Sequence, residues 1–265
     1  MSAPEAAART AVASRKARAV PFWSGVFTVA AREVGGLFEG RIATVSAIAF
    51  TLLANSIFMN EFFLSGRVDM GPWFDLMPLL LPVFLPAVTM RLWAEERKQR
   101  TLEMLLTMPI RAGQAVLGKY LAALLLLGLF VAAALPVVVM LLSLGDPDVG
   151  LLFSGLLGTL LLGAELIALG MLVSSLCNDQ IVAFVSTTVL GLTLVLLGDD
   201  RVVAALDGLA DASAPGTWLR EHVSALPAFD SLVRGLLGVP ALVHVVGACV
   251  LFLALNAWVL ERKRG

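Results

Sequence analysis

Three polar side chains interrupt the longest apolar runs of this sequence and are its first candidates for chemistry. Glu165 lies in the middle of the run Gly150–Leu176, and His244 and Asn256 lie in the run Val239–Leu260. An ionised carboxylate at the centre of such a run costs at least ~2.5 kcal/mol in a bilayer, so Glu165 should face other helices, a cavity or a second subunit. Two interpretations of Glu165 are equally favoured: it lines a substrate path, or it is protonated and hydrogen-bonds a neighbouring helix. For His244 and Asn256, a polar packing contact is favoured over a place along the same path.

The sequence lacks the combinations of residues that enzyme active sites require. Paired carboxylates, a Ser/His set and His-rich ligands at one depth are missing, and the two cysteines, Cys177 and Cys249, suit neither a disulfide framework nor a metal site. The phosphate-binding pattern Gly-x-x-x-x-Gly-Lys-Ser/Thr is also missing, because Gly118-Lys119 is followed by Tyr120 and opens an apolar run. We therefore expect a non-catalytic chain that binds no metal and no cofactor of its own.

One long charged segment, Met90–Tyr120, separates two apolar runs and should lie in water between two membrane spans. Thr101 can cap a short helix there, Glu103 suits the positive end of the helix dipole, and Pro109 ends the helix. An apolar face bordered by charge favours docking into a groove on a soluble partner, although an ordinary charged loop is the alternative. The predicted docking residues are Thr101, Leu102, Glu103, Leu105, Leu106 and Pro109, and the charged flank is Glu95, Glu96 and Arg97.

The run EERKQRTLEMLLTMPI, followed by GKYLAALLLL, resembles the signature of type-2 ABC exporter permeases, most closely the gliding-motility-type branch. Arg100 stands where the family usually has glycine. Weaker similarities lie in Phe74–Arg91, in Ser174-Ser175-Leu176 and in Ala228-Phe229-Asp230. The resemblance implies that Thr101–Pro109 is a coupling helix, which contacts an ATP-binding subunit and passes its movement to the membrane spans.

The resemblance also implies the partners of the chain. ATP and Mg²⁺ would be bound by the separate ATP-binding subunit. The second membrane half would be another copy of the permease, or an unlike membrane protein with a large extracytoplasmic domain. The implied location is the bacterial plasma (inner) membrane.

The composition is that of an integral membrane protein. Of the 265 residues, 59% are hydrophobic and 15% are charged, whereas a globular domain has roughly half apolar and a quarter charged residues. A formal net charge of −1 argues against a nucleic-acid partner, which requires a concentrated basic face. We expect an all-α fold embedded in the lipid bilayer.

The apolar runs predict six transmembrane helices. A disordered tail (1–21) and an interfacial helix (22–41) precede them, with Arg32 and Glu33 away from the apolar side of that helix. Three prolines should bend the second span. Short re-entrant or surface helices should fill the extracytoplasmic stretch between spans five and six, and residues 261–265 form the C-terminus. The predicted spans are 42–64, 73–93, 116–144, 150–176, 181–197 and 239–260.

The distribution of basic residues predicts the orientation. With both termini in the cytosol, 15 of the 19 Lys and Arg residues lie on the cytosolic side, as the positive-inside rule favours. The four that remain outside are Arg67, Arg201, Arg220 and Arg234.

Three functions follow from these features. The first is the permease subunit of an ATP-driven exporter. The second is a force-transmitting or regulatory subunit that acts on an envelope partner and passes no solute. A membrane-embedded enzyme is a remote third. A continuous cavity lined by Glu165 and His244 would favour the first.

Overall fold

The structure, a computed structural model, describes residues 21–39, 41–98, 111–209 and 214–262. Every regular element in these ranges is a helix, which confirms the all-α prediction. The helices are α2 (Phe22–Glu39), α3 (Arg41–Ser65), α4 (Gly71–Lys98), α6 (Ala112–Ala132), α7 (Leu135–Leu144), α8 (Val149–Leu176), α9 (Gln180–Leu196), α10 (Asp200–Gly208), α11 (Pro215–His222), α12 (Leu226–Val233) and α13 (Val239–Arg262).

Five helical segments among the described residues are long and apolar enough to cross a membrane. They are α3, α4, α6 with α7, α8 and α13. The predicted fifth span coincides with α9, whose 17 residues reach only roughly 26 Å, against a hydrocarbon core of ~30 Å. A bend of 82° separates α9 from α10, and the two together bring the number of candidate spans to six.

The predicted third span is interrupted between residues 132 and 135. Helix α6 ends at Ala132 and α7 begins at Leu135, with Pro136 in the first turn of α7. A proline has no N–H to donate, and its ring clashes with the carbonyl group four residues earlier, which here belongs to Ala132. In α4, by contrast, the prolines Pro78, Pro82 and Pro86 lie within one continuous helix.

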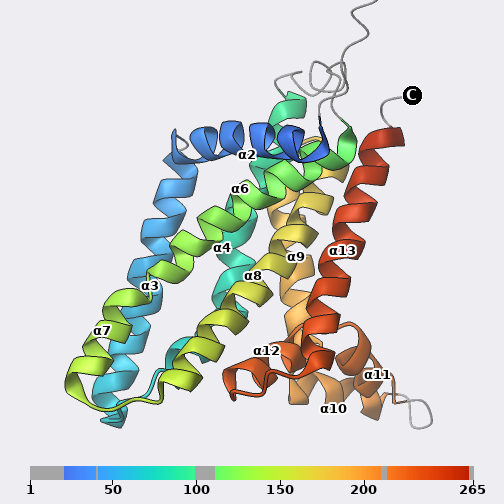
Figure 1. Cartoon of the computed structure of the whole chain (residues 1–265). Helices are drawn as coiled ribbons and strands as arrows, with labels where there is room; N and C mark the ends of the chain where they lie inside the picture. The colour runs from blue at the N-terminus through green and yellow to red at the C-terminus, as the bar shows by residue number, and fades with distance from the viewer. Residues whose placement is uncertain (1–20, 40, 99–110, 210–213, 263–265) are drawn as a thin grey trace, which may run out of the picture.

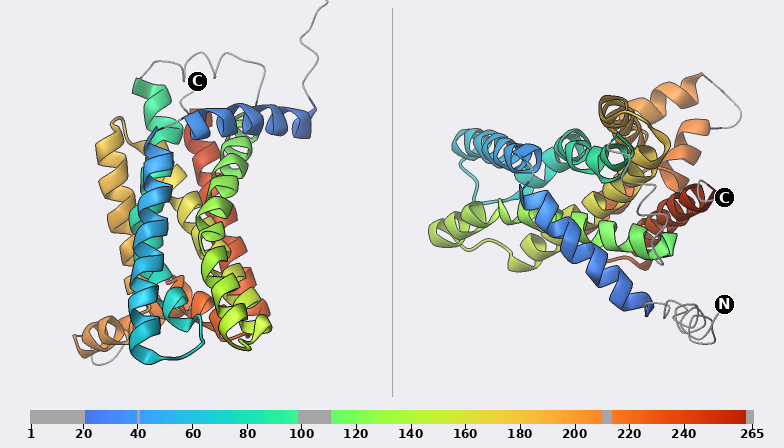
Figure 2. Two further views of the ribbon diagram at one scale, coloured as in Figure 1. Left: turned by 90° about the vertical axis from the view of Figure 1, so that its left-hand side faces the viewer. Right: turned by 90° about the horizontal axis from the view of Figure 1, so that it is seen from above.

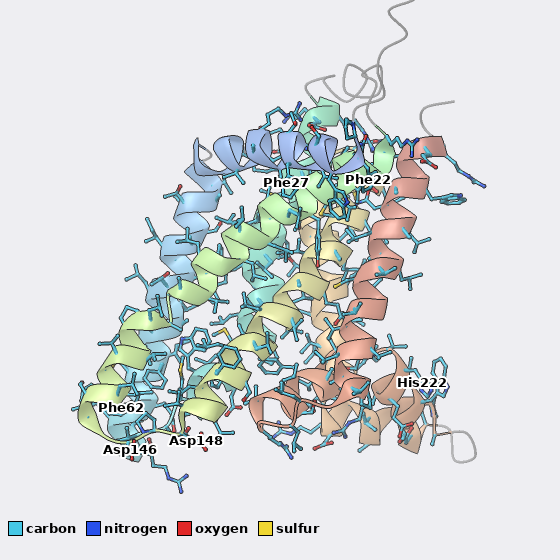
Figure 3. All side chains as sticks on the ribbon, viewed as in Figure 1. Phe22, Phe27, Phe62, Asp146, Asp148 and His222 are labelled. Carbon is cyan, nitrogen blue, oxygen red and sulfur yellow. The ribbon has the colours of Figure 1, made fainter. Side chains whose placement is uncertain are left out.

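Figure 1 shows the spans side by side, with α2 lying across one end of the bundle and α10, α11 and α12 gathered at the other. The view from above in Figure 2 shows the direction of α2 across that end. The last described residues of α13, the end of α4 and the start of α6 all lie at the α2 end (Figure 1). In Figure 3, Phe22 and Phe27 of α2 are therefore far from Asp146 and Asp148, which lie in the turn between α7 and α8.

Helix α8 lies at the centre of the bundle and packs against α4, α6, α9, α12 and α13. Small residues allow these approaches. A Cβ atom added to Gly163 would lie 2.5 Å from Leu127 of α6, and one added to Gly155 would overlap the ring of Phe74 of α4. Gly158 faces α12 in the same way. The glycines of α8 therefore contact three different neighbours.

The outer helices expose their apolar side chains. In the most apolar windows of α3 and α13, only 22% and 11% of the residues are buried. A helix that is apolar all round but packed on one side requires an apolar environment on the other. The fold is that of a multi-pass membrane protein.

Candidate functional site

The predicted docking residues, Thr101, Leu102, Glu103, Leu105, Leu106 and Pro109, lie outside the described residues. Both flanks of the segment are described. Helix α4 leads into it and α6 follows it, at the end of the bundle where α2 crosses (Figure 1). The site is therefore built from the contacts that hold these two helix ends.

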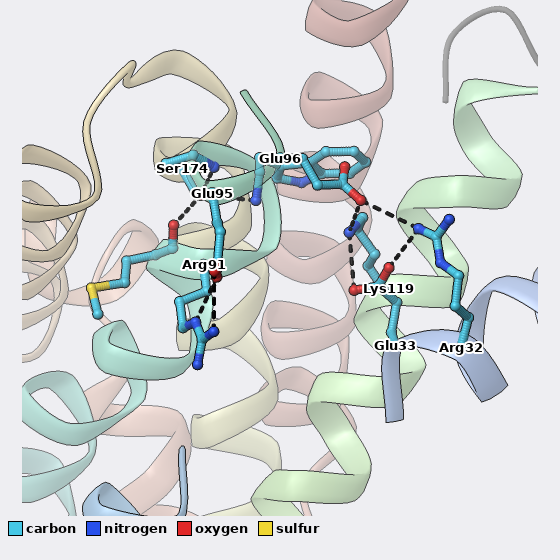
Figure 4. A network of polar contacts seen from close by, with 10 residues as sticks. Arg32, Glu33, Arg91, Glu95, Glu96, Lys119 and Ser174 are labelled. Atoms are coloured by element: carbon cyan, nitrogen blue, oxygen red, sulfur yellow. Dashed lines mark hydrogen bonds and ion pairs between the residues drawn. The ribbon is translucent and has the colours of Figure 1, made fainter. Parts of the chain in front are cut away.

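A buried lysine joins α2, α4 and α6 (Figure 4). The side chain of Lys119, on α6, is 1% exposed, and its Nζ lies 3.0 Å from Glu33 Oε2 of α2 and 2.9 Å from Glu96 Oε1 of α4. The ammonium group also lies 4.9 Å from the centre of the Trp93 ring, within the range of a cation–π contact. Arg32 of α2 adds ion pairs to Glu33, at 2.8 Å, and to Glu96, at 3.3 Å. We call Arg32, Glu33, Glu96 and Lys119 the junction network.

Helix α2 reaches the junction network because it lies tightly on α6. Gly118 approaches α2 so closely that a Cβ atom there would lie 2.7 Å from Val29 Cβ. The Gln114 side-chain amide donates a hydrogen bond to the Phe22 carbonyl, 3.0 Å away. The sequence pattern placed Glu33 away from the apolar side of α2 that includes Phe27. In the structure Phe27 is 63% exposed and Glu33 meets Lys119 of α6.

The charges of the network shift the pKa of Glu33. Burial alone would raise this pKa, but Lys119 and Arg32 outweigh it and hold the pKa below its ordinary value of 4.5. Glu33 is therefore ionised at neutral pH, as its two ion pairs require.

A second set of contacts joins the end of α4 to the end of α8. Arg97 donates hydrogen bonds to the carbonyl groups of Ser175 and Cys177, both at 2.6 Å, and to Asn178 Oδ1 at 2.7 Å. These are the carbonyl groups that a helix leaves without partners at its C-terminus, where a cation is also favoured. Ser174 Oγ donates to the Met90 carbonyl, 3.1 Å away. The same oxygen accepts from the backbone N–H groups of residues 93 and 94.

The charged flank predicted from the sequence is thus engaged within the chain. Glu95 pairs with Arg91 one turn earlier, at 2.6 Å, Glu96 belongs to the junction network, and Arg97 caps α8. The sequence pattern does not indicate the partners of these residues. One signal in the sequence was available. Lys119 begins a long apolar run, and a lysine is almost never buried in such surroundings without a charged partner, so a partner for Lys119 could have been expected.

Glu165 of α8 and His244 of α13 meet inside the bundle. His244 Nε2 lies 3.8 Å from Glu165 Oε1, and the glutamate side chain is 1% exposed. Neither carboxylate oxygen nor His244 Nε2 has a hydrogen-bond partner among the described residues. Nearby, the Tyr120 hydroxyl donates to the Ala164 carbonyl at 3.2 Å. Two of the three polar residues singled out in the apolar runs therefore form one cluster.

Asn256 is the third polar residue singled out in the apolar runs. It is fully buried, and its amide has no partner in the part of the chain that the structure describes. It lies about three helical turns beyond His244 on α13, so it belongs to another level of the bundle. Among the described residues, no three His, Cys, Asp or Glu side chains are arranged to hold a metal ion.

Residues 71–198, from the start of α4 to the turn after α9, match the family model described as ABC-2 family transporter protein. The match supports an ABC-2-type permease. Among curated proteins, none matches the sequence significantly. The matched part of the chain contains the docking segment, Arg97, Lys119 and Glu165, whereas Glu33 and His244 lie outside it.

Proposed function

We propose that this chain is the transmembrane permease subunit of an ATP-driven exporter of the gliding-motility type. It is non-catalytic and binds no cofactor: ATP and Mg²⁺ belong to a separate ATP-binding subunit, on which Thr101–Pro109 docks as a coupling helix. The observation that carries the proposal is the family match over 71–198, which includes this segment.

In this proposal the α2 end of the bundle faces the cytosol of a bacterium, and both termini lie there. The basic residues counted by the positive-inside rule support this orientation. The short helices α10, α11 and α12 then lie on the extracytoplasmic side of the inner membrane. The second membrane half is another copy, or an unlike partner with an extracytoplasmic domain.

The contacts at the two ends of the docking segment explain how movement would pass into the membrane. A force on the segment acts directly on α4 and α6, which flank it. The junction network ties both helices to α2, and Arg97 and Ser174 tie α4 to α8. Because ion pairs and hydrogen bonds of this kind resist separation, α4, α6 and α8 move together, and α8 carries Glu165.

A force-transmitting subunit that passes no solute would use the same docking segment. The two residues that were to separate these functions do not share a cavity: His244 lines a pocket between α11, α12 and α13, and Glu165 is not part of its lining. Their pairing at 3.8 Å fits a substrate path and a packing contact between α8 and α13 equally well.

Co-purification with the ATP-binding subunit tests the proposal. Leu105→Asp places a charge on the apolar docking face, so we expect loss of the ATP-binding subunit while the chain still inserts in the membrane. Leu209→Asp is the matched control, because Leu209 is 84% exposed at the opposite end of the bundle. Normal recovery of the ATP-binding subunit with Leu105→Asp would contradict the docking assignment.

A further inference from the structure

The helices α10 and α11 form a hairpin that projects from the bundle at the end opposite α2. In Figure 2 these orange helices lie crosswise to the spans, at the level where α3 ends, and the view from above shows them extending outward past α9. Among the described helices, α10 packs chiefly on α11, and α11 makes a smaller contact with α12. Part of the hairpin surface is therefore covered by no helix that the structure describes.

The position of the bend between α9 and α10 sets the depth of the hairpin in the bilayer. Asn178, just before α9, accepts a hydrogen bond from Arg97, so α9 begins beside the charged flank at the α2 end. Its 17 residues span roughly 26 Å, whereas the hydrocarbon core is ~30 Å thick. The chain therefore turns by 82° into α10 at the far boundary of the core, before it reaches water. A Cβ atom added to Gly198, in this bend, would lie 2.5 Å from Ser224 Oγ, so the bend is packed against the bundle.

The apolar outer surface of α9 leads directly into this bend. Val185, Val189 and Leu196 are each about half exposed, and Leu196 is the last residue of α9. An apolar helix that is packed on one side requires an apolar environment on the other. The lipid that covers α9 therefore extends to the start of the hairpin.

Contacts between α10 and α11 hold the hairpin together as one unit. Asp207 Oδ1 accepts a hydrogen bond from the backbone N–H of Gly216 at 2.6 Å, and Asp207 Oδ2 accepts one from the Thr217 hydroxyl at 2.7 Å. Arg220 of α11 forms an ion pair with Asp200 of α10. Because these bonds join the two helices to each other, the surface that remains exposed belongs to the unit as a whole.

The exposed surface of the hairpin carries large apolar side chains. Leu209, directly after α10, is 84% exposed, and Trp218 of α11 is 56% exposed. The Trp218 ring stacks on the His222 ring with 5.1 Å between their centres, and Figure 3 shows His222 at the outer edge of the hairpin. Tryptophan is enriched at membrane–water interfaces, because its ring is apolar and its N–H reaches the polar headgroups.

The charges of the two helices do not favour an anionic surface. Helices α10 and α11 contain the acids Asp200, Asp207 and Glu221 and the bases Arg201 and Arg220, so the acids exceed the bases by one. A helix that binds a membrane by charge is rich in Lys and Arg on its polar face. Any attachment of this hairpin to lipid must therefore be apolar.

We propose that the α10–α11 hairpin lies in the boundary between headgroups and acyl chains of the leaflet opposite α2, with Leu209 and Trp218 inserted into the lipid. The occupant of the exposed surface is lipid, because the hairpin begins at the edge of the hydrocarbon core and continues the lipid-covered surface of α9. This inference requires only that the chain spans a membrane, and it does not rest on the proposed permease function.

The test is the collision accessibility of spin labels, measured by electron paramagnetic resonance on the full chain in lipid nanodiscs. Leu209→Cys and Trp218→Cys carry the labels one at a time, in a chain whose Cys177 and Cys249 are replaced by alanine. The two probes are oxygen, which concentrates in the bilayer, and nickel(II) ethylenediaminediacetate, which stays in water. At both sites we expect a ratio of oxygen to nickel accessibility several-fold higher than at Asp146→Cys, in the turn between α7 and α8.

Matched controls separate insertion from general exposure. Ala204→Cys is also exposed on α10, but it lies about 140° around the helix from Leu209, so its ratio should be several-fold lower than that at Leu209→Cys. Val189→Cys, on the exposed side of α9, is the lipid reference, and a high ratio there in every sample shows that the span is intact. The ratios at the hairpin should be the same in phosphatidylcholine nanodiscs and in nanodiscs that contain phosphatidylglycerol.

Three outcomes would overturn the proposal. Ratios at Leu209→Cys and Trp218→Cys equal to that at Asp146→Cys would place the hairpin in water. Low accessibility to both probes would show that a second copy or another protein segment covers it. A high ratio only with phosphatidylglycerol would show attachment by charge. The measurement needs no ATP-binding subunit, so its result and the result of the docking test are independent.

Discussion

Replacing Lys119 by methionine should destabilise the junction network at the α2 end of the bundle more than the change of any exposed charge does. The methionine side chain keeps most of the volume but removes the ammonium group that lies between Glu33 and Glu96. Two carboxylates, only 15% and 17% exposed, then share the remaining cation, Arg32. Their mutual repulsion and incomplete hydration destabilise the folded state.

The size of the effect follows from burial. Breaking a buried ion pair by removing one partner costs about 3–5 kcal/mol, and the lower end applies here because Arg32 still pairs with both acids. At ~2–4 °C per kcal/mol for a chain of this size, the midpoint of thermal unfolding in detergent should fall by roughly 6–12 °C. Arg32→Gln, whose side chain is 52% exposed, should cost at most about 1 kcal/mol.

A second variant tests the cause. Lys119→Met combined with Glu96→Gln removes one of the two acids and leaves the 2.8 Å pair of Arg32 with Glu33 intact. Part of the lost stability should return, so the double variant should be more stable than Lys119→Met alone. The reasoning is refuted if the melting temperature of Lys119→Met falls no further than that of Arg32→Gln. It is also refuted if the loss of stability in the double variant equals the sum of the losses in Lys119→Met and Glu96→Gln.

Two further predictions concern the same end of the bundle. The folded-state pKa of Glu33 is depressed, so its contribution to the free energy of unfolding is fully present above the unfolded-state pKa near 4.5 and is lost as the pH falls through the folded-state pKa. The temperature of unfolding, measured from pH 7 to pH 3, should therefore fall less in Glu33→Gln than in the wild type. Arg97→Ala removes three hydrogen bonds from the end of α8 and should lower the free energy of unfolding by about 1–3 kcal/mol. Lys98→Ala, at the exposed neighbouring residue, is the control. Equal melting temperatures of the two variants would show that Arg97 does not stabilise the end of α8.

The apolar runs determined most of the helical architecture. Hydropathy and helix-breaking residues act locally, so the helices around α3, α4, α8 and α13 follow from runs such as Gly150–Leu176 without reference to the rest of the chain. The docking segment is likewise predicted from a local pattern, around Thr101 and Pro109, and it stays a prediction because these residues lie outside the described ranges. Two details were not predicted: Pro136 divides the third span into α6 and α7, and α9 is short and turns sharply into α10.

The partners of the polar residues were decided by the tertiary structure alone. Glu165 and His244 lie on helices far apart in the sequence, and their meeting depends on how α13 packs against α8. The same holds for Lys119, whose two carboxylate partners come from α2 and α4. A sequence shows that a buried charge needs a partner, because the cost of leaving it alone is a property of the residue. Which partner it finds depends on the register and crossing of whole helices, and no local pattern records that.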